Sequence, residues 1–477
     1  MNMGSFIFIN RVTFALTLAL CISIFGQTAH GQVETCEAEP GEVLIDIFIQ
    51  TDLPAIAAQY NLNPTPLGQV GTPPTYRMAF LPSNTQTPCQ LVAAMQNDSR
   101  IKQREVNRIL KVIEKQGLPW TQGHSWAIGH SWAIGGSGKG YAKQYFPELI
   151  KLNQAHNISR GDNMVIAVLD TGIDLTHPAF AGRLVPGYDF VDNDNDPSEV
   201  GSLRQDAVYG HGTHVAGIIA LVAPNAKIMP IRILDVNGES NLWRVKDAML
   251  WAARNSNSLN NTTIINMSFG YPLDFTPQSN TFLHDFFQGC DDIPVPLEQV
   301  FCQANEDRLL IVAAAGNGGR IGNGANRIYP AAERGATIAD SNGIDDNLMS
   351  VGASTRYDRL AAFSTMAHAT SNDDRPERTV APGENIVSTL PGGRYGVWSG
   401  TSMAAPIVSG IAALVKSANP NIVLTDLVER IEETGYEWDC VLSSRGNTKM
   451  ETARVDAFCA LTNNVMCYTP RTGICTE

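Results

Sequence analysis

Residues 164–173 read Met-Val-Ile-Ala-Val-Leu-Asp-Thr-Gly-Ile, an apolar run that ends on the carboxylate of Asp170. Short apolar runs of this kind are typical of buried strands. The sequence predicts strands at 164–169, 227–233, 263–267, 309–314 and 348–351, and helices at 213–222, 242–255, 402–418 and 424–433. Apolar strands that alternate with helices indicate an α/β fold, with a mostly parallel sheet between helices.

Three polar residues stand at element ends, where parallel sheets place their chemistry. Asp170 ends the first strand, His211 opens a helix in His-Gly-Thr-His-Val-Ala-Gly, and Ser402 opens another in Ser-Gly-Thr-Ser-Met-Ala-Ala-Pro. A carboxylate can orient an imidazole, and the imidazole can then act as a general base for a serine. The helix N-terminus beside Ser402 favours an oxyanion. These residue types together predict nucleophilic catalysis.

Each of these residues also has a plainer interpretation. Asp170 could cap a turn and Ser402 could cap its helix. His211 and His214 could hold a metal, but their spacing differs from the H-E-x-x-H zinc motif. Ala404 interrupts the G-x-S-x-G elbow, which argues against an α/β-hydrolase.

The segments around Asp170, His211 and Ser402 resemble, in the same order, the three signature segments of the subtilisin-like serine proteases, or subtilases. The resemblance runs from about residue 148 to about residue 464. It implies a subtilisin-like three-layer fold. It also implies a serine endopeptidase that uses these residues as an Asp-His-Ser triad and forms an acyl-enzyme.

Two further motifs carry the same resemblance. Residues 313–317 (Ala-Ala-Ala-Gly-Asn) are similar to the family segment whose asparagine helps to bind the oxyanion, which implies a catalytic role for Asn317. Residues 266–270 (Asn-Met-Ser-Phe-Gly) resemble the edge to which an extended substrate adds as a strand. The implied substrate-binding residues are Ser268, Phe269, Gly270, Ala314 and Gly316. A turn asparagine and an ordinary strand end are the plainer alternatives.

Residues 1–31 are predicted to be a signal peptide. Arg11 precedes the apolar run 12–25, and the small residues Ala29 and Gly31 follow it. Lipid attachment at Cys21 is an alternative. The run is shorter than the about 20 residues that a membrane span needs. We therefore expect a secreted protein, extracellular or periplasmic, without a stable membrane span.

Residues 32–118 have the pattern of a small α+β domain, with strands at 42–50, 76–81 and 101–110 and a helix at 90–96. This domain resembles the family's ferredoxin-like pro-domain, which assists folding and then inhibits the enzyme. The resemblance implies a zymogen. Residues 119–147 are predicted to be a linker and processing region that contains a local duplication, Gly-His-Ser-Trp-Ala-Ile at 123–128 and again at 129–134. Residues 148–477 are the predicted catalytic domain, with a Cys-rich C-terminal end.

Eight cysteines follow the signal peptide, and an even number in an exported chain predicts disulfides. They form three groups along the chain, and pairing within groups is the simplest scheme: Cys36 and Cys89; Cys290 and Cys302; Cys440, Cys459, Cys467 and Cys475.

Calcium is the one cofactor that the resemblance suggests, as a structural ion that the chemistry does not need. Ala179 follows His177-Pro178, where many subtilases have a calcium-binding aspartate, so that site is in doubt. The segment 188–197 resembles the acidic calcium loop of thermitase-like members. Its implied oxygen ligands are Asp189, Asp192, Asp194 and Asp196. A solvated turn is the alternative.

The charge balance bears on the partners. The chain has 34 basic and 47 acidic side chains among 477 residues, a net charge of −13, which argues against a nucleic-acid partner. We expect protein or peptide substrates, the chain's own pro-domain as an intramolecular inhibitor, and a monomer. A pseudoprotease that only binds peptides, and a serine esterase, are the competing functions.

Overall fold

The computed structural model describes most of the chain beyond residue 35. The described residues are 36–71, 74–112, 133–134, 137–202, 205–206, 208–256, 263–272, 309–318, 328–329, 331, 348–365, 379–442, 448–464 and 471–474. Every helix and strand named below lies within the unit formed by residues 38–477.

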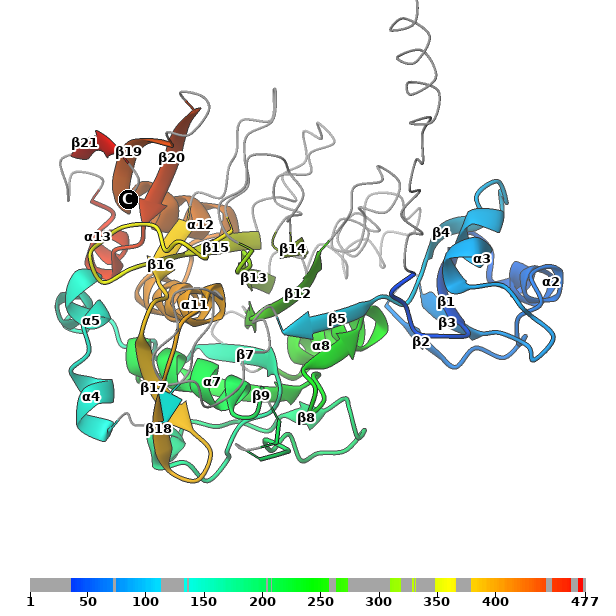
Figure 1. The fold of residues 1–477 in the computed structure, drawn as a ribbon, viewed down its shortest axis with the longest axis horizontal. Helices are drawn as coiled ribbons and strands as arrows, with labels where there is room; N and C mark the ends of the chain where they lie inside the picture. The colour runs from blue at the N-terminus through cyan, green and yellow to red at the C-terminus, as the bar shows by residue number, and fades with distance from the viewer. Residues whose placement is uncertain are drawn as a thin grey trace, which may run out of the picture. The chain divides into compact units, whose positions relative to one another are not determined.

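The first domain is a four-stranded antiparallel sheet with two helices (Figure 1). Its elements are β1 (Glu42–Ile47), η1 (Gln50–Asp52), α2 (Leu53–Gln59), β2 (Gly68–Val70), β3 (Thr75–Ala79), α3 (Pro88–Ala94) and β4 (Ile101–Glu105). The strand order β2-β3-β1-β4 is that of a ferredoxin-like fold, as predicted. Val43 and Ile45 of β1 pack with Ile56 and Leu91 of the helices. Leu44, on the opposite face, joins the core of the larger domain.

A ten-stranded sheet forms the centre of the second domain (Figure 1). Its order is β21 (Arg471–Ile474), β19 (Tyr436–Leu442), β20 (Thr448–Arg454), β16 (Thr379–Pro382), β15 (Leu348–Ser354), β13 (Leu309–Ala314), β11 (Thr263–Met267), β7 (Val165–Asp170), β9 (Lys227–Arg232) and β8 (Tyr188–Asp189). Every neighbouring pair is parallel except β19 and β20. The sheet is therefore mostly parallel, as predicted.

Alternate residues of these strands face two helical layers. Ile166 and Val168 of β7 pack with α7 (His211–Val222) and α11 (Thr401–Ala418), and α12 (Leu424–Glu433) and α13 (Ala457–Thr462) extend that layer. Ala167 and Leu169 pack with α8 (Leu242–Asn255) on the other face. Burial on both faces explains why the strands are nearly continuous apolar runs. The predicted three-layer fold is confirmed.

One predicted strand, 101–110, is two strands in the structure. β4 ends at Glu105, and a separate strand β5 (Ile109–Val112) lies between β10 (Glu239–Asn241) and β12 (Phe269–Pro272) of the larger domain. Asn107, between β4 and β5, is fully buried, and its side-chain oxygen accepts a hydrogen bond from Trp243 N at the start of α8. Its Nδ2 donates to Glu42 Oε2 of β1 at 3.0 Å, so Asn107 is bonded to both domains at the point where the predicted strand is interrupted.

Several short elements were not predicted. A three-stranded antiparallel sheet consists of β17 (Ile386–Leu390), β18 (Arg394–Trp398) and β6 (Ala133–Ile134), and β14 (Ile328–Tyr329) pairs with β12. The remaining helices are α4 (Gly138–Ala142), α5 (Phe146–Leu149), α6 (Leu152–Ala155) and η2 (Pro178–Phe180). Among the described residues, α11 is the one helix long and apolar enough to cross a membrane, and 89% of its apolar window is buried in the protein core.

Candidate functional site

Asp170 and His211 form a buried pair. Asp170 is the last residue of β7, and its Oδ1 accepts hydrogen bonds from His211 Nδ1 at 2.7 Å and from Thr171 N at 2.8 Å. Both side chains are about 1% exposed. Gly212 permits this approach, because a Cβ there would lie 2.2 Å from the carbonyl oxygen of Gly172. The glycine of the His-Gly-Thr-His motif therefore lets α7 begin beside the end of β7.

Ser402 is fully buried and lies in the first turn of α11, which packs against α7. Its Oγ donates a hydrogen bond to the carbonyl oxygen of Ser268 at 3.1 Å. In return, Ser268 Oγ donates to the carbonyl oxygen of Ser402 at 3.2 Å. Pro406 explains why this carbonyl is available: it is the residue four positions on and has no N–H to donate. The reciprocal pair joins the substrate-edge motif to the helix that carries Ser402.

A series of buried side-chain hydrogen bonds holds Ser268 in place. Asn266 Nδ2 donates to Ser268 Oγ at 3.0 Å, and Ser409 Oγ donates to Asn266 Oδ1 at 2.9 Å. All three side chains are fully buried. Because each donor has an acceptor, this series of hydrogen bonds fixes the rotamer of Ser268.

Asn317 lies beside the residue that precedes Ser402. Its Oδ1 accepts hydrogen bonds from Thr401 N at 2.9 Å and from Thr401 Oγ1 at 3.1 Å, and Thr401 Oγ1 accepts from Gly316 N at 3.0 Å. The other end of the amide, Nδ2, is buried and has no hydrogen-bond partner among the described residues. The Asn317 amide is buried, its oxygen is held by Thr401, and its N–H₂ has no acceptor among the described residues. It can therefore donate a hydrogen bond to a ligand that binds there.

The predicted substrate edge is occupied by the chain's own strand β5. Val112 and Lys111 pair antiparallel with Phe269 and Gly270, while Lys111, Leu110 and Ile109 pair with β10 on the other side. Leu110 is fully buried in an apolar cluster with Leu242 and Phe269. The remaining two predicted substrate residues lie at the end of β13: Ala314 is buried, and Gly316 has φ +105°. The structure thus brings an extended segment onto the edge where the sequence predicted one.

Trp398 is a neighbour of both motif histidines that the sequence did not reveal. Its ring lies 5.3 Å from that of His211 and stacks on His214 at 4.9 Å, with 12° between the planes. In the part of the chain that the structure describes, no three His, Cys, Asp or Glu side chains converge as they would to bind a metal. His214 is therefore placed as a packed core residue.

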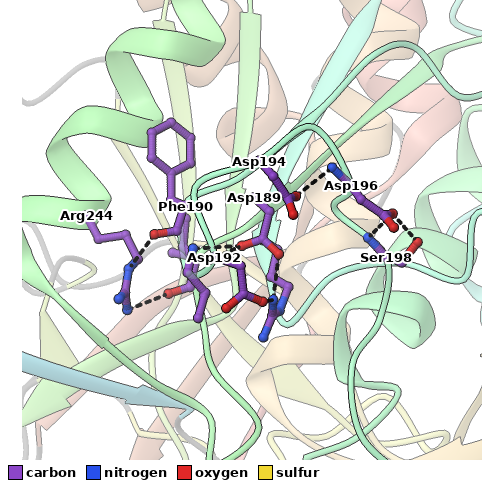
Figure 2. A network of polar contacts seen from close by, with 10 residues as sticks. Asp189, Phe190, Asp192, Asp194, Asp196, Ser198 and Arg244 are labelled. Carbon is purple, nitrogen blue, oxygen red and sulfur yellow. Dashed lines mark hydrogen bonds and ion pairs between the residues drawn. The ribbon is translucent and has the colours of Figure 1, made fainter.

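The acidic loop 188–197 is held by hydrogen bonds and by an arginine (Figure 2). Asp189 Oδ1 accepts from Val191 N and Asp192 N, at 2.7 and 3.0 Å. Asp189 and Asp192 both pair with Arg232 Nη1 at 2.5 Å. Two of the four predicted calcium ligands therefore already neutralise an arginine, and this geometry does not fit a calcium ion held by all four.

Asp194 and Asp196 lie further along that loop and are exposed, as is the side chain of Asp192 at 61%. Asp194 Oδ1 accepts from Asp196 N at 2.9 Å, and Asp196 Oδ1 accepts from Ser198 Oγ at 2.5 Å (Figure 2). These short contacts are those of a hydrogen-bonded turn. The Asp189 carboxylate is therefore the buried one of the four, and the carboxylates of Asp192, Asp194 and Asp196 are exposed.

Cys36, Cys89 and Cys459 are disulfide-bonded. The proposed signal peptide, the duplicated hexapeptides apart from Ala133 and Ile134, and Cys290, Cys302, Cys467 and Cys475 lie outside the described residues. The pairing scheme therefore stays a prediction.

A model of the family described as "Subtilase family" matches residues 161–448. The chain is 35% identical over 335 residues to the thermophilic serine proteinase of Bacillus sp. (strain AK1), a match that covers 68% of each chain. It is 33% identical over 283 residues to Subtilisin NAT of Bacillus subtilis subsp. natto, covering 57% of this chain but only 61%, less than two thirds, of that relative.

The fold is also similar to a solved structure, the crystal structure of fervidolysin from Fervidobacterium pennivorans, a keratinolytic enzyme related to subtilisin. The TM-score is 0.62 at 22% identity, and the match covers 91% of this chain and 62% of the other. At this level of identity the likeness concerns the fold.

Proposed function

Because the chain belongs to the subtilase family of serine endopeptidases, we propose that it hydrolyses peptide bonds with Asp170, His211 and Ser402. His211 accepts the proton of Ser402 Oγ as that oxygen attacks the peptide carbonyl carbon. The tetrahedral intermediate collapses when His211 returns the proton to the departing amine, which leaves a serine ester. Water, deprotonated by His211, then hydrolyses the ester. The 2.7 Å contact between Asp170 and His211 is the observation that carries this proposal.

Asn317 would supply the oxyanion hole together with the Ser402 amide. The supporting observation is its buried Nδ2, which has no partner among the described residues, while Thr401 holds the amide oxygen. A donor fixed in advance stabilises the developing negative charge without reorganising during the reaction. Thr401 would therefore position Asn317, a role that no sequence motif indicated.

The substrate would bind as an added strand on β12, in the manner that β5 does within this chain. Main-chain pairing gives affinity in this mode, and side-chain contacts give specificity. Since Leu110 is buried against Leu242 and Phe269, the enzyme would favour a large aliphatic side chain at that position of a substrate. A precursor in which residues 32–118 cover the edge would be a zymogen, inhibited by its own chain until cleavage releases the segment.

We also propose that the protein is secreted and that it binds a structural calcium ion. Residues 1–31 would direct export, which agrees with the disulfide-bonded cysteines. A structural calcium ion would use the exposed carboxylates of Asp194 and Asp196 with loop carbonyls, because Arg232 occupies Asp189 and Asp192. A rise in melting temperature with added calcium, lost in Asp194→Asn, would support this ligand set, and an unchanged melting temperature would remove it.

The decisive experiment for the function is Ser402→Ala, assayed on a protein substrate and on an ester. Ser417→Ala is the matched control, since Ser417 lies on the same helix and its Oγ donates to the carbonyl oxygen of Asp162 at 2.9 Å. We expect the first variant to lose both activities and the control to keep them. Retention of full peptidase activity by Ser402→Ala would reject the nucleophile. Ester hydrolysis without protein hydrolysis by the parent enzyme would favour the esterase, and tight peptide binding without either activity would favour the pseudoprotease.

A further inference from the structure

Glu199 joins the two segments that carry Asp170 and His211. Its Oε1 accepts a hydrogen bond from Thr171 Oγ1 at 2.6 Å, and its Oε2 accepts from Thr213 Oγ1 at 2.8 Å and from Thr213 N at 3.2 Å. Thr171 directly follows Asp170, and Thr213 lies in the first turn of the helix that His211 begins. One carboxylate therefore links the end of β7 to the start of α7.

The same two threonines also cross-link these segments to each other. Thr171 Oγ1 accepts from Gly212 N, on the histidine side, at 3.0 Å. Thr213 Oγ1 accepts from Asp174 N, on the aspartate side, at 2.9 Å. Because each hydroxyl already accepts a backbone N–H, its own proton is directed to Glu199. Glu199 is thus the common acceptor of a reciprocal clamp around the Asp170–His211 pair.

The environment of Glu199 changes its ionisation. Burial raises the pKa of its carboxyl most, the charge of Asp170 raises it too, and the hydrogen bonds from Thr171 and Thr213 lower it, so that the pKa rises from the usual 4.5 to about 7. On the loop ahead of α7, the pKa of Tyr209 is raised by its own burial and by the charge of Glu199. Among the described residues, the ionisable groups beside Glu199 and its threonine partners include Asp170 of β7, Tyr209 and Asp174, whose N–H donates to Thr213 Oγ1.

We propose that Glu199 is a positioning residue of this protease, which holds Asp170 and His211 in register and adds negative charge near the imidazole. This inference rests on the proposed function, since it requires His211 to be the general base. Above about pH 7, where Glu199 is ionised, its charge also favours the imidazolium that forms when Ser402 loses its proton. The first role affects the geometry of proton transfer, and the second affects its pH dependence.

Glu199→Gln separates this role from simple packing, because glutamine preserves size but not the pattern of acceptors. Its carbonyl can accept at one end of the clamp, while its N–H₂ must face donors at the other end. Whichever orientation the glutamine adopts, it loses the hydrogen bond from one threonine hydroxyl, and the carboxylate charge is lost. Glu432→Gln is the matched control: Glu432 is also largely buried, and it accepts from Thr379 Oγ1 at 3.1 Å in another part of the domain.

The experiment measures kcat and KM of the mature enzyme across pH 5–9. The concentration of active sites, by which each rate is divided, is determined by fluorophosphonate labelling. For Glu199→Gln we expect kcat to fall by about tenfold to a hundredfold, the scale of a small misplacement of catalytic groups. We expect KM to stay within about twofold, because substrate binding is untouched. The deficit in kcat should be largest above about pH 7, where Glu199 is ionised and both of its oxygens accept, and it should shrink at lower pH as the carboxyl gains a proton. Glu432→Gln should show none of these changes.

Two further variants keep the inference open to refutation if Glu199→Gln does not fold. Thr171→Val and Thr213→Val each remove a hydroxyl that donates to Glu199, and each should lower kcat with little change in KM. A parental kcat and pH profile in Glu199→Gln, or in both threonine variants, would overturn the inference. That result would leave the proposed function intact, provided that Ser402→Ala is inactive, so the two claims fail separately.

Discussion

Ser268 and Ser402 exchange two hydrogen bonds, in which the hydroxyl of each donates to the backbone carbonyl of the other at 3.1 and 3.2 Å. The second bond occupies a carbonyl that Pro406 cannot serve within α11. The side chain of Ser268 therefore completes the hydrogen bonds of the helix that carries Ser402.

Ser268→Ala should destabilise the protein, because it removes the donor to the buried Ser402 carbonyl. An unsatisfied buried acceptor costs about 1–3 kcal/mol, so the free energy of unfolding should fall by that amount. Pro406→Ala supplies an N–H to the same carbonyl and should recover part of the loss in the double variant. Urea unfolding in a Ser402→Ala background, which prevents self-digestion, measures both. Strictly additive effects of the two substitutions would contradict the account.

Asn317→Leu should lower kcat far more than it alters KM. Loss of one oxyanion donor costs about 10²–10³ in kcat, a magnitude taken from subtilisin. Thr401→Val should have a smaller effect in the same direction, because it removes one of the two hydrogen bonds that hold the Asn317 oxygen. Steady-state kinetics on a peptide substrate decide this, and an unchanged kcat in Asn317→Leu would remove that residue from the oxyanion hole.

We expect the first maturation cut shortly after Val112 and before residue 119, upstream of the processing region 119–147 that the sequence predicts. Along β5, the step from Lys111 to Val112 runs back along β12 from Gly270 to Phe269, towards Ser268 and the hydroxyl of Ser402. Strand β5 therefore runs towards Ser402, the proposed nucleophile. N-terminal sequencing of the early cleavage products tests this, and a first cut within the linker 119–147 would contradict it.

Leu110→Asp should weaken inhibition by the pro-segment, since it places an unpaired charge in an apolar cluster. Proteolytic activity should then appear earlier after synthesis of the precursor. Leu67→Asp is the control, because Leu67 is 53% exposed on the same domain. Equal delays in both variants would show that Leu110 does not anchor the pro-segment.

The contribution of Glu199 to stability should decline as the pH rises. Its pKa is raised on folding from 4.5 to about 7, so the folded state retains the proton over a range in which the unfolded state has lost it. Its stabilisation is thus complete below about pH 4.5 and decreases up to about pH 7, by at most about 3 kcal/mol. In a Ser402→Ala background, the stability of the parent relative to Glu199→Gln should fall between pH 5 and 7. A difference that does not vary with pH would contradict the raised pKa.

Much of the fold was predictable because each buried strand and each covering helix is one continuous segment with its own apolar pattern. β11, β13, α8 and α12 have the predicted bounds, and α8 begins where Asn241 caps it by accepting from Arg244 N at 3.0 Å. The hairpin β17–β18 was missed although Ile386 and Leu390 are buried in the core, because the two polar residues between them are buried as well. Ser388 and Thr389 donate to the carbonyl oxygens of His214 and Thr213, so the apolar pattern of the strand is interrupted.

The site was predictable where short motifs place residues at element ends, and it was hidden where distant residues complete it. Asp170 and His211 were found from their motifs, and the structure pairs them. Glu199 lies in a loop that carries no motif. The one local signal is the pair Thr171 and Thr213 beside the motif residues, because buried hydroxyls need a hydrogen-bond acceptor. Arg232 is distant in sequence from the acidic loop, so nothing local revealed that it would occupy Asp189 and Asp192.

Mass spectrometry of the enzyme after fluorophosphonate treatment identifies the residue that acts as the nucleophile. We expect a single adduct on the peptide that contains Ser402, with peptidase activity lost in proportion to labelling. Full inactivation with the adduct on another residue, or an active enzyme with Ser402 fully labelled, would show that Ser402 is not the nucleophile.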